Sequence, residues 1–330
     1  MKKALYILAE YSLDLIYGPE EQTDIARLVD VYAPPQTPQS VLAQPDLLRE
    51  VQIILSGWGA PTFDAAFLDA APRLEAVFYG AGSIRSLVTE AFWDRGVVIC
   101  SAWGMNAVPV AEYALSQILF SLKHGWRYAL TVKQEGHYPR KWPVPGAYGS
   151  TIALISLGMI GRRVAELLKP FDLRVIAYDP FVKPEDAAAL GVTLCSLEEA
   201  FRQGDVVSLH TPWLKETEGM ITGDHFRLMK EGATFINTAR GAVVNEPEMI
   251  ETLQARPDLF ALLDVTHPEP PLSGSPLYTL PNVMLTPHIA GAMNRECRRM
   301  GREMVNELRR YLNGEPLQWS IDRERAARLA

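Results

Sequence analysis

The chain has few of the residues that build metal sites and disulfide frameworks. Its 330 residues include only three cysteines, Cys100, Cys195 and Cys297, and no C-x-x-C pair occurs. This spacing excludes the usual structural zinc motifs and argues against a disulfide framework. We therefore expect no metal site, and we expect a reduced, cytoplasmic protein.

Basic clusters and long apolar runs are also missing. The formal net charge is -7, and no block of Lys and Arg interrupts this mild acidity. Such a surface does not suit nucleic acid or an anionic membrane. The apolar run at 4–8 is followed by Glu10 and lacks a small-residue cleavage site, so it predicts a buried strand and not a signal peptide. No stretch is long enough to span a bilayer, so we expect neither nucleic acid nor a membrane as a partner.

What the sequence does have is an alternation of apolar runs and helix-period segments along its whole length. This alternation is typical of a parallel α/β fold. A chain of 330 residues is longer than one hydrophobic core usually fills, so two domains are predicted. Buried strands are expected at the short apolar runs 4–8, 51–56, 74–80, 96–102, 151–156, 173–179, 205–211, 233–239, 259–265 and 282–288.

Helices are indicated between these runs. Ser196 and Glu199 form a capping-box pattern at the head of one of them. Residues 106–130 have apolar positions at helical spacing, and residues 135–150, which are rich in Pro, Gly and aromatics, predict an irregular excursion. An amphipathic helix is predicted from 296 until Gly314 and Pro316 end it.

A turn at 156–161 resembles a phosphate-binding turn with one departure. Ser156 stands where the G-x-G-x-x-G pattern has its first glycine, so the turn reads S-x-G-x-x-G. Gly158 lies where backbone must approach a pyrophosphate, and Gly161 allows close contact of helix and strand. The helix N-terminus would supply N–H groups to the phosphates, with Met159 and Ile160 in its first turn. Ser156 fits this turn if its φ is negative.

A second strand after this helix ends at Asp179, about 20 residues downstream of the turn. A carboxylate there can accept hydrogen bonds from both adenosine-ribose hydroxyls and would repel a 2′-phosphate. The residues that follow, Pro180 and Phe181, include no arginine, so NAD is favoured over NADP. The alternatives are a generic βαβ turn and a site for another adenosine ligand such as S-adenosylmethionine.

Three later strand ends each offer a residue suited to acid–base work on an oxo acid. These are Arg240 in "INTARG", Glu269 in "THPEP" and His288 in "LTPHIAG". Histidine is the natural proton donor because its ordinary pKa is about 6.5, a carboxylate beside it fixes the ring, and arginine binds a carboxylate with its planar fork. Each residue alone also has a plain structural reading, and His267 is a competing imidazole.

Together these stretches resemble the D-specific 2-hydroxyacid dehydrogenase family, from "YGAGS" through "NAVPVAEYAL", "SLGMIGR", "HTPWLKET" and "NTARG" to "TPHIAG". The resemblance implies a flavodoxin-like substrate domain, formed by residues 1–104 and 292–330, and a Rossmann NAD-binding domain, 105–291. It also implies an NAD-dependent enzyme that interconverts a 2-oxo acid and a D-2-hydroxy acid. In that reaction His288 would be the general acid/base, Glu269 its orienting partner and Arg240 the substrate clamp.

The resemblance assigns further positions. Cofactor contacts would come from Asp264, which would meet the nicotinamide carboxamide, from Thr238 and Ala239, and from an adenine-side loop of His210, Thr211 and Pro212. The backbone of Gly80, Ala81 and Gly82 would hold the substrate carboxylate. This loop departs from the usual pattern, so Trp58, Arg85 and Trp103 either shape an unusual pocket or pack between domains.

Family members are usually homodimers, and residues 136–149 form the candidate dimer arm, with an unstructured loop as the alternative. A second functional hypothesis is a non-catalytic NAD(H)-sensing binding protein on the same scaffold. It would be indicated by a lost catalytic residue or an added peptide-binding tail, and the sequence shows neither. A methyltransferase would leave Arg240, Glu269 and His288 unexplained.

Overall fold

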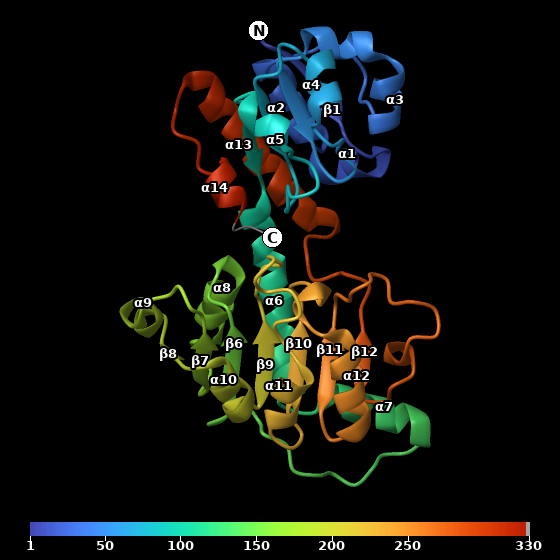
Figure 1. The fold of residues 1–330 in the computed structure, drawn as a ribbon, viewed down its shortest axis with the longest axis vertical. Helices are drawn as coiled ribbons and strands as arrows, with labels where there is room; N and C mark the ends of the chain where they lie inside the picture. Colours follow the sequence, from blue (N-terminus) through green and yellow to red (C-terminus); the bar gives the residue numbers. More distant parts are fainter. Residues whose placement is uncertain (328–330) are drawn as a thin grey trace. The chain divides into compact units, whose positions relative to one another are not determined.

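The computed structural model describes residues 1–327, and the chain separates into two compact units (Figure 1). Unit 1 consists of Met1–Ala107 and the segment from Ala292 onward, and unit 2 consists of Val108–Gly291. Each unit has its own sheet in which every named strand pair is parallel. The predicted fold class, two parallel-sheet α/β domains, is confirmed.

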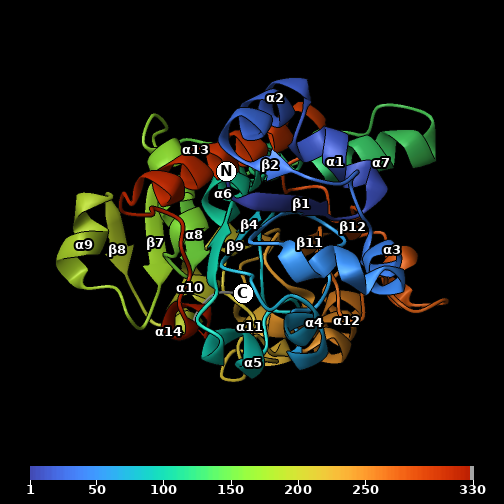
Figure 2. The ribbon, with the colours of Figure 1, turned by 90° about the horizontal axis from the view of Figure 1, so that it is seen from above.

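The sheet of unit 1 has the strand order β2-β1-β3-β4-β5, which is the flavodoxin-like order. Its strands are β1 (Lys3–Ile7), β2 (Asp30–Val31), β3 (Ile53–Ser56), β4 (Ala76–Tyr79) and β5 (Val98–Ser101). Strands β1, β3, β4 and β5 are almost entirely buried, since helices cover both faces of the sheet. Figure 2 shows α2 (Pro19–Leu28) and α13 (Cys297–Asn313) on one face, and α3 (Pro38–Ala43) and α4 (Ala65–Ala70) on the other. Helices α1 (Glu10–Ile16), α5 (Glu90–Asp94) and α14 (Arg323–Ala326) also belong to this unit.

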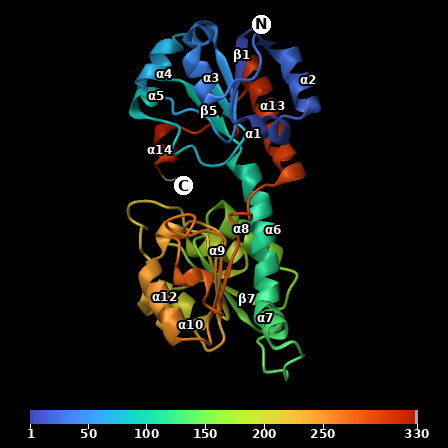
Figure 3. The same ribbon diagram turned by 90° about the vertical axis from the view of Figure 1, so that its right-hand side faces the viewer.

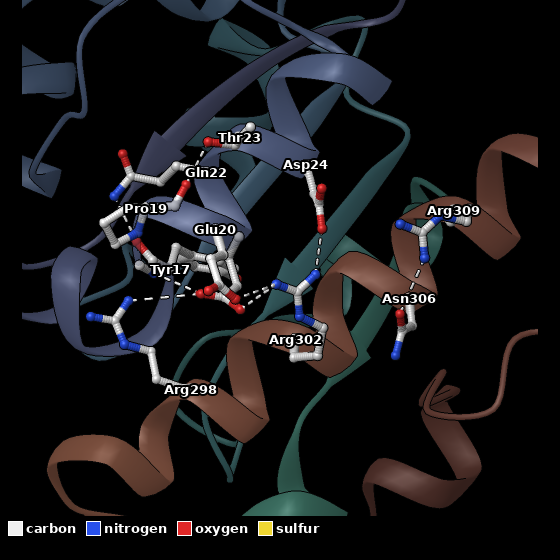
Figure 4. A network of polar contacts seen from close by, with 12 residues as sticks. Tyr17, Pro19, Glu20, Gln22, Thr23, Asp24, Arg298, Arg302, Asn306 and Arg309 are labelled. Carbon is white, nitrogen blue, oxygen red and sulfur yellow. Dashed lines mark hydrogen bonds and ion pairs between the residues drawn. The ribbon is translucent and has the colours of Figure 1, made fainter.

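Helix α13 is joined to α2 by charged side chains (Figure 4). Arg302 of α13 forms ion pairs with Glu21 at 2.7 Å and with Asp24. The Glu21 side chain is only 7% exposed and also accepts a hydrogen bond from the backbone of Gly18. A Cβ atom at Gly301 would lie 1.9 Å from the Ile16 carbonyl oxygen, so the helix packs closely against the end of α1.

The sheet of unit 2 has seven strands in the order β12-β11-β10-β9-β6-β7-β8. Figure 3 shows α6 (Trp103–Ser121) and α7 (Gly125–Glu135) on one face, and α10 (Leu197–Gln203) and α12 (Glu246–Ala255) on the other. Helices α8 (Met159–Leu168) and α9 (Pro184–Ala189) share the α6 face, whereas α11 (Gly223–Leu228) packs with α10 and α12. The strands are β6 (Thr151–Ile155), β7 (Arg174–Tyr178), β8 (Val192–Leu194), β9 (Val206–Leu209), β10 (Thr234–Asn237), β11 (Phe260–Leu263) and β12 (Val283–Leu285).

Several local predictions can be compared with the elements. The capping box of Ser196 and Glu199 is present at the start of α10, and α13 ends before Gly314, which has a φ of 68°. The helix-period segment 106–130 is interrupted, because His124 has a φ of 49° and separates α6 from α7. Strands β2 and β8 were not predicted, since each is too short to give an apolar run.

The order of the unit 2 strands reverses at β6, which pairs with β7 on one side and β9 on the other. In open parallel sheets, ligands bind where the order reverses, outside the carboxyl ends of the strands. The turn at Ser156 and the residue His210 both lie at this edge, and the His210 N–H donates to the Ile155 carbonyl. Among the described residues, none of the helices has the length and apolarity needed to cross a membrane.

Candidate active site

Arg240, Glu269 and His288 follow three strands that are neighbours in the sheet of unit 2. Arg240 comes after β10, Glu269 after β11 and His288 after β12, and these strands are adjacent in the order β12-β11-β10. Because carboxyl ends of parallel strands meet at one edge, the three residues belong to the same edge of the sheet.

His288 and Glu269 are in direct contact. Nδ1 of His288 lies 2.6 Å from Oε1 of Glu269, and both side chains are about half exposed, at 48% and 42%. His288 has a φ of 54°, a left-handed conformation that is uncommon outside glycine. His267 is not part of this pair, because its ring packs against Trp213 with centroids 5.3 Å apart.

The turn that carries Arg240 is braced by Asn237. The Asn237 side chain accepts a hydrogen bond from Ala239 N and donates one to the Arg240 carbonyl, each at 3.0 Å. The next residue, Gly241, lies against the segment that leads to Glu269, since an added Cβ would be 2.0 Å from the Thr266 carbonyl carbon. Only glycine permits this approach, so the Arg240 turn and the Glu269 loop are held side by side.

Asp264 holds the turn that presents His288. Its buried carboxylate accepts hydrogen bonds from the backbone N–H groups of Ile289 and Ala290, each at 2.9 Å, and from the Thr286 hydroxyl at 2.6 Å. Its carbonyl accepts the N–H of His288 at 3.0 Å. Successive N–H groups beside a left-handed residue form a concave anion site, which here encloses a carboxylate of the chain itself.

The phosphate-type turn forms between β6 and α8, but Ser156 does not have the expected backbone conformation. Its φ is 80°, so the expectation of a negative φ is wrong. The turn follows the geometry that a glycine would give, and two contacts hold the serine in it. Its N–H donates to the Tyr178 carbonyl at 2.8 Å, and its hydroxyl donates to Asp179 at 3.3 Å.

The two glycines of the turn differ in what surrounds them. A Cβ at Gly161 would lie 2.1 Å from the Ser156 carbonyl oxygen, so this glycine is needed for close contact of helix and strand. A Cβ at Gly158 would meet nothing within 4 Å, so the start of α8 has open space in front of it. A group approaching the N-terminus of α8 therefore has room.

The Asp179 carboxylate is fully engaged within the chain. Oδ1 accepts the N–H groups of Phe181 and Val182 at 2.8 and 3.1 Å. Oδ2 accepts the Leu157 N–H at 2.8 Å and the Ser156 hydroxyl at 3.3 Å. A carboxylate has about four acceptor positions, so all of them are occupied by donors of this chain.

Two buried polar groups at the same edge have no partner within residues 1–327. They are the ring nitrogens of His210 and the hydroxyl of Thr238. Burial lowers the pKa of His210 to about 4, so its ring is neutral near pH 7. The neighbouring Thr211 hydroxyl donates to the Ile155 carbonyl at 3.3 Å. Buried groups of this kind ordinarily have a hydrogen-bond partner, so they mark a place for a ligand.

The loop at 80–82 follows β4 in unit 1. The Gly80 N–H donates to the Ser56 carbonyl at 2.8 Å, so this amide is engaged within the protein. The Ser101 hydroxyl contacts the carbonyls of both Ala81 and Gly82. In a trans peptide the N–H points opposite to the C=O, so the N–H groups of Gly82 and Ser83 point away from Ser101.

Residues 115–290 match the NAD binding domain of the D-isomer specific 2-hydroxyacid dehydrogenase family. This match covers more than half of the chain. The chain belongs to that family. The predicted resemblance is thereby confirmed, and unit 2 contains the family's NAD-binding domain.

Two curated relatives give a measure of distance within the 2-hydroxyacid dehydrogenases. A D-3-phosphoglycerate dehydrogenase of Archaeoglobus fulgidus is 31% identical over 259 residues, which cover 78% of this chain and 49% of that protein. A putative 2-hydroxyacid dehydrogenase, YoaD of Bacillus subtilis, is 34% identical over 228 residues, covering 67% of this chain and 65% of the relative. The chain thus spans about half the length of the first of these relatives.

Solved structures agree on the fold. The TT0316 protein of Thermus thermophilus has a TM-score of 0.76 at 27% identity, with 97% of this chain and 99% of that chain covered. An NAD-complexed D-isomer specific 2-hydroxyacid dehydrogenase of Lactobacillus delbrueckii ssp. bulgaricus has a TM-score of 0.79 at 22% identity, with 98% and 100% covered.

The residues of this site fit NAD, and Asp264 and Asp179 differ in how many acceptor positions they leave for it. The open space at Gly158 and the unpaired buried groups of His210 and Thr238 suit a dinucleotide at the strand ends. Asp264 has accepted three hydrogen bonds and so retains one of about four acceptor positions for an amide donor. Asp179 retains none, so a ribose hydroxyl would have to displace one of its present donors.

The tryptophans of unit 1 pack against its own cores. Trp58 lies against both hydrophobic clusters of the unit, and Trp103 forms an edge-to-face contact with Trp319, with centroids 5.8 Å apart. Arg325 lies over the Trp103 ring at 5.1 Å.

Several supporting residues were missed by sequence reasoning. Asn237, Tyr113 and Thr286 shape the site through contacts with residues already singled out. Asn237 and Thr286 stand at strand ends within the quoted motifs, which is the one signal that could have found them. Among residues 1–327, His, Cys, Asp and Glu nowhere gather in a group able to hold a metal ion.

Proposed function

We propose that this family member is an NAD-dependent oxidoreductase that interconverts a 2-oxo acid and a D-2-hydroxy acid. The observation that carries the proposal is the His288–Glu269 contact of 2.6 Å, at the carboxyl edge of the sheet in an NAD-binding domain. A proton donor oriented by a carboxylate is what reduction of a carbonyl requires beyond a hydride source. Bound NADH supplies the hydride.

His288 moves the proton in this proposal. Its Nδ1 faces Glu269, so Nε2 is the nitrogen that presents a proton to the carbonyl oxygen during reduction and takes it back during oxidation. Glu269 holds the ring in this orientation and stabilises its charged form. Half exposure of both side chains is consistent with a group that must meet a substrate.

Arg240 binds the substrate in this proposal. A terminal nitrogen of its guanidinium donates to the Ala239 carbonyl at 2.6 Å, which anchors the head group beside its own strand end. The Gly241 contact with Thr266 keeps this turn against the Glu269 loop. A planar cation in that position suits a carboxylate and the adjacent carbonyl.

We also propose the cofactor and substrate contacts. The dinucleotide would be held by the turn and strand ends of unit 2, at Ser156, Gly158, Met159, Ile160, Gly161, Asp179, His210, Thr211, Pro212, Thr238, Ala239, Asp264 and His288. Unit 1 would serve as the substrate domain and bind the substrate carboxylate through the loop of Gly80, Ala81 and Gly82. Within this loop, the N–H groups of Gly82 and Ser83 are the proposed donors, because the carbonyls of the same peptide groups point to Ser101. The Gly80 N–H already donates to the Ser56 carbonyl.

A homodimer is proposed from the segment 136–149. Tyr138 and Tyr148 are 90% and 85% exposed, and α7 has no buried residue. The segment is anchored at Trp142, which stacks on Tyr128 with centroids 3.8 Å apart. Exposed aromatics on an anchored arm suit contact with a second copy. A cytoplasmic location is proposed from the three cysteines, all of them free thiols.

The test mixes the protein and NADH with glyoxylate, hydroxypyruvate, pyruvate and bulkier 2-oxo acids, and follows NADH loss. We expect at least one acid to be reduced to the D-hydroxy product, and His288→Ala to lower kcat by about 10²–10⁴-fold. NADH binding without turnover of any acid would contradict the proposal and support the NAD(H)-sensing alternative. Light scattering of the wild type and of a Tyr138→Ser/Tyr148→Ser variant tests the dimer.

A further inference from the structure

A chain of hydroxyl groups links helix α6 to the carboxylate that holds the His288 turn. The Tyr113 hydroxyl on α6 lies 3.1 Å from the Thr286 hydroxyl. The Thr286 hydroxyl in turn lies 2.6 Å from Oδ1 of Asp264. Tyr113 and Thr286 are 173 positions apart in the sequence, so the contact is made by the tertiary fold.

The direction of these hydrogen bonds follows from counting hydrogens. Thr286 has a single hydroxyl hydrogen, and the ionised Asp264 carboxylate can only accept. Thr286 must therefore donate to Asp264, and the remaining hydrogen bond has to be donated by Tyr113 to Thr286. The result is a directed relay that starts at Tyr113 and ends at the carboxylate.

Asp264 passes this constraint to the turn after β12. The residue is 3% exposed, and its carboxylate receives the N–H groups of Ile289 and Ala290, which immediately follow His288. The left-handed φ of His288 is unfavourable for a residue with a Cβ atom and persists only where its surroundings enforce it. Two charge-assisted hydrogen bonds to a fixed carboxylate provide that enforcement.

We propose that Tyr113 is a positioning residue for His288, acting through Thr286 and Asp264 to hold the carboxylate that shapes the His288 turn. The expected effect of Tyr113 on catalysis rests on the proposed function. The effect on the turn itself does not depend on that function. Within residues 1–327, the Tyr113 hydroxyl is hydrogen-bonded to Thr286 and not to His288 or Glu269, so it acts through the relay.

The surroundings of Tyr113 allow its hydroxyl to be removed without disturbing the fold. Tyr113, Thr286 and Asp264 line one small cavity together with Gln117, Trp126 and Thr238. A phenylalanine keeps the ring that fills this space and loses only the oxygen. Burial raises the pKa of Tyr113, so its hydroxyl remains protonated and can donate throughout the neutral range.

The experiment compares Tyr113→Phe, Thr286→Val and Thr286→Ser with the wild type. Loss of one hydrogen bond typically changes an equilibrium about fivefold. We expect Tyr113→Phe to speed hydrogen exchange of the Ile289 and Ala290 amides about fivefold and to lower kcat by a similar factor, with the oxo-acid KM nearly unchanged. Thr286→Val should do more, and Thr286→Ser should restore both values because it keeps the hydroxyl.

Tyr32→Phe is the matched control. The Tyr32 hydroxyl is also half-buried and also donates to one partner, the Leu47 carbonyl, but it belongs to unit 1. Tyr32→Phe should change neither the hydrogen exchange of the Ile289 and Ala290 amides nor kcat. Unaltered exchange at Ile289 and Ala290 in both Tyr113→Phe and Thr286→Val would overturn the proposal. If the wild type reduces no oxo acid, the proposed function fails, while the exchange rates still decide the role of Tyr113.

Discussion

Nδ1 of His288 lies 2.6 Å from Oε1 of Glu269, and the two residues follow neighbouring strands, β12 and β11. The pair therefore depends on the register of the sheet and on the two loops that leave it. Four predictions concern this pair, the turn at Ser156, the burial of His210 and, in unit 1, the ion pairs of Arg302.

Glu269→Gln should lower kcat by about 10²-fold while leaving NADH affinity within about twofold of the wild type. The amide can still accept a hydrogen bond from the His288 ring, but it no longer stabilises the charged form. Stopped-flow reduction of the best oxo acid gives kcat, and quenching of tryptophan fluorescence gives the NADH affinity. Equal activity of the variant and the wild type would show that the carboxylate is dispensable. Glu296→Gln is the control, at a partly buried carboxylate in the 3₁₀ turn Asn294–Glu296 that accepts the Met293 N–H at 2.9 Å.

Ser156→Ala and Ser156→Gly should both bind NADH about two- to fivefold more tightly than the wild type. Each removes the hydroxyl that occupies the fourth acceptor position of Asp179, which a ribose hydroxyl could then use. Only the glycine variant also relieves the left-handed φ of 80°, so it should be more stable than the alanine variant. Titration calorimetry measures the first effect and thermal unfolding the second. Weaker binding by both variants would mean that the serine hydroxyl itself contacts the cofactor.

The free energy of unfolding should decrease as the pH falls below 6.5, because His210 is buried as a neutral ring. Burial holds its pKa at about 4 in the folded chain, whereas the unfolded side chain titrates near ~6.5. Between these values the unfolded state binds the extra proton, so this contribution is complete above pH 6.5 and declines as the pH falls towards 4. The free energy of unfolding should lose about 1.4 kcal/mol per pH unit in this window.

Denaturant unfolding of the wild type and His210→Gln at several pH values isolates this contribution. The variant should be less stable at pH 7.5 and have a flatter pH dependence between 6.5 and 5. His137→Gln, at a side chain that is 69% exposed, should keep the wild-type slope. A slope that is the same in all three proteins would rule out a buried neutral His210.

Arg302→Met should lower the free energy of unfolding of the full chain by about 1–3 kcal/mol, because it leaves the 7%-exposed Glu21 carboxylate without its closest cation. This loss is smaller than that for a fully buried pair because Arg302 is 36% exposed and solvent screens part of the interaction. Arg309→Met on the same helix removes only an exposed contact with Asn306 and should change stability little. Equal stability of the two variants in urea would contradict the prediction.

The sheet architecture could be predicted because each long strand is a continuous apolar run that ends in turn residues. β6 and β10 are fully buried on both faces, and such burial leaves a plain signature in the sequence. The pairing of His288 with Glu269 was reached through the family resemblance, since 19 positions and two loops separate the residues.

Other features could not be predicted because they depend on contacts between distant residues or on backbone angles. The relay from Tyr113 exists only once α6 lies against β12. The positive φ of Ser156 is set by Tyr178 and Asp179, more than 20 positions away, and serine by itself favours negative values. The engagement of the Gly80 N–H likewise depends on the pairing of β4 with β3.

The contrast between the two acids of unit 2 has a practical consequence for engineering. Asp264 has one acceptor position without a donor, whereas all the acceptor positions of Asp179 are occupied. In the proposed binding mode, the nicotinamide end of a dinucleotide would therefore meet a free acceptor and the adenosine end would not. Experiments to alter coenzyme preference should therefore first vary residue 156, and only afterwards mutate Asp179. Asp264 is best left unchanged, because its replacement would remove the proposed nicotinamide contact and also the hydrogen bonds to Ile289 and Ala290 that hold the His288 turn.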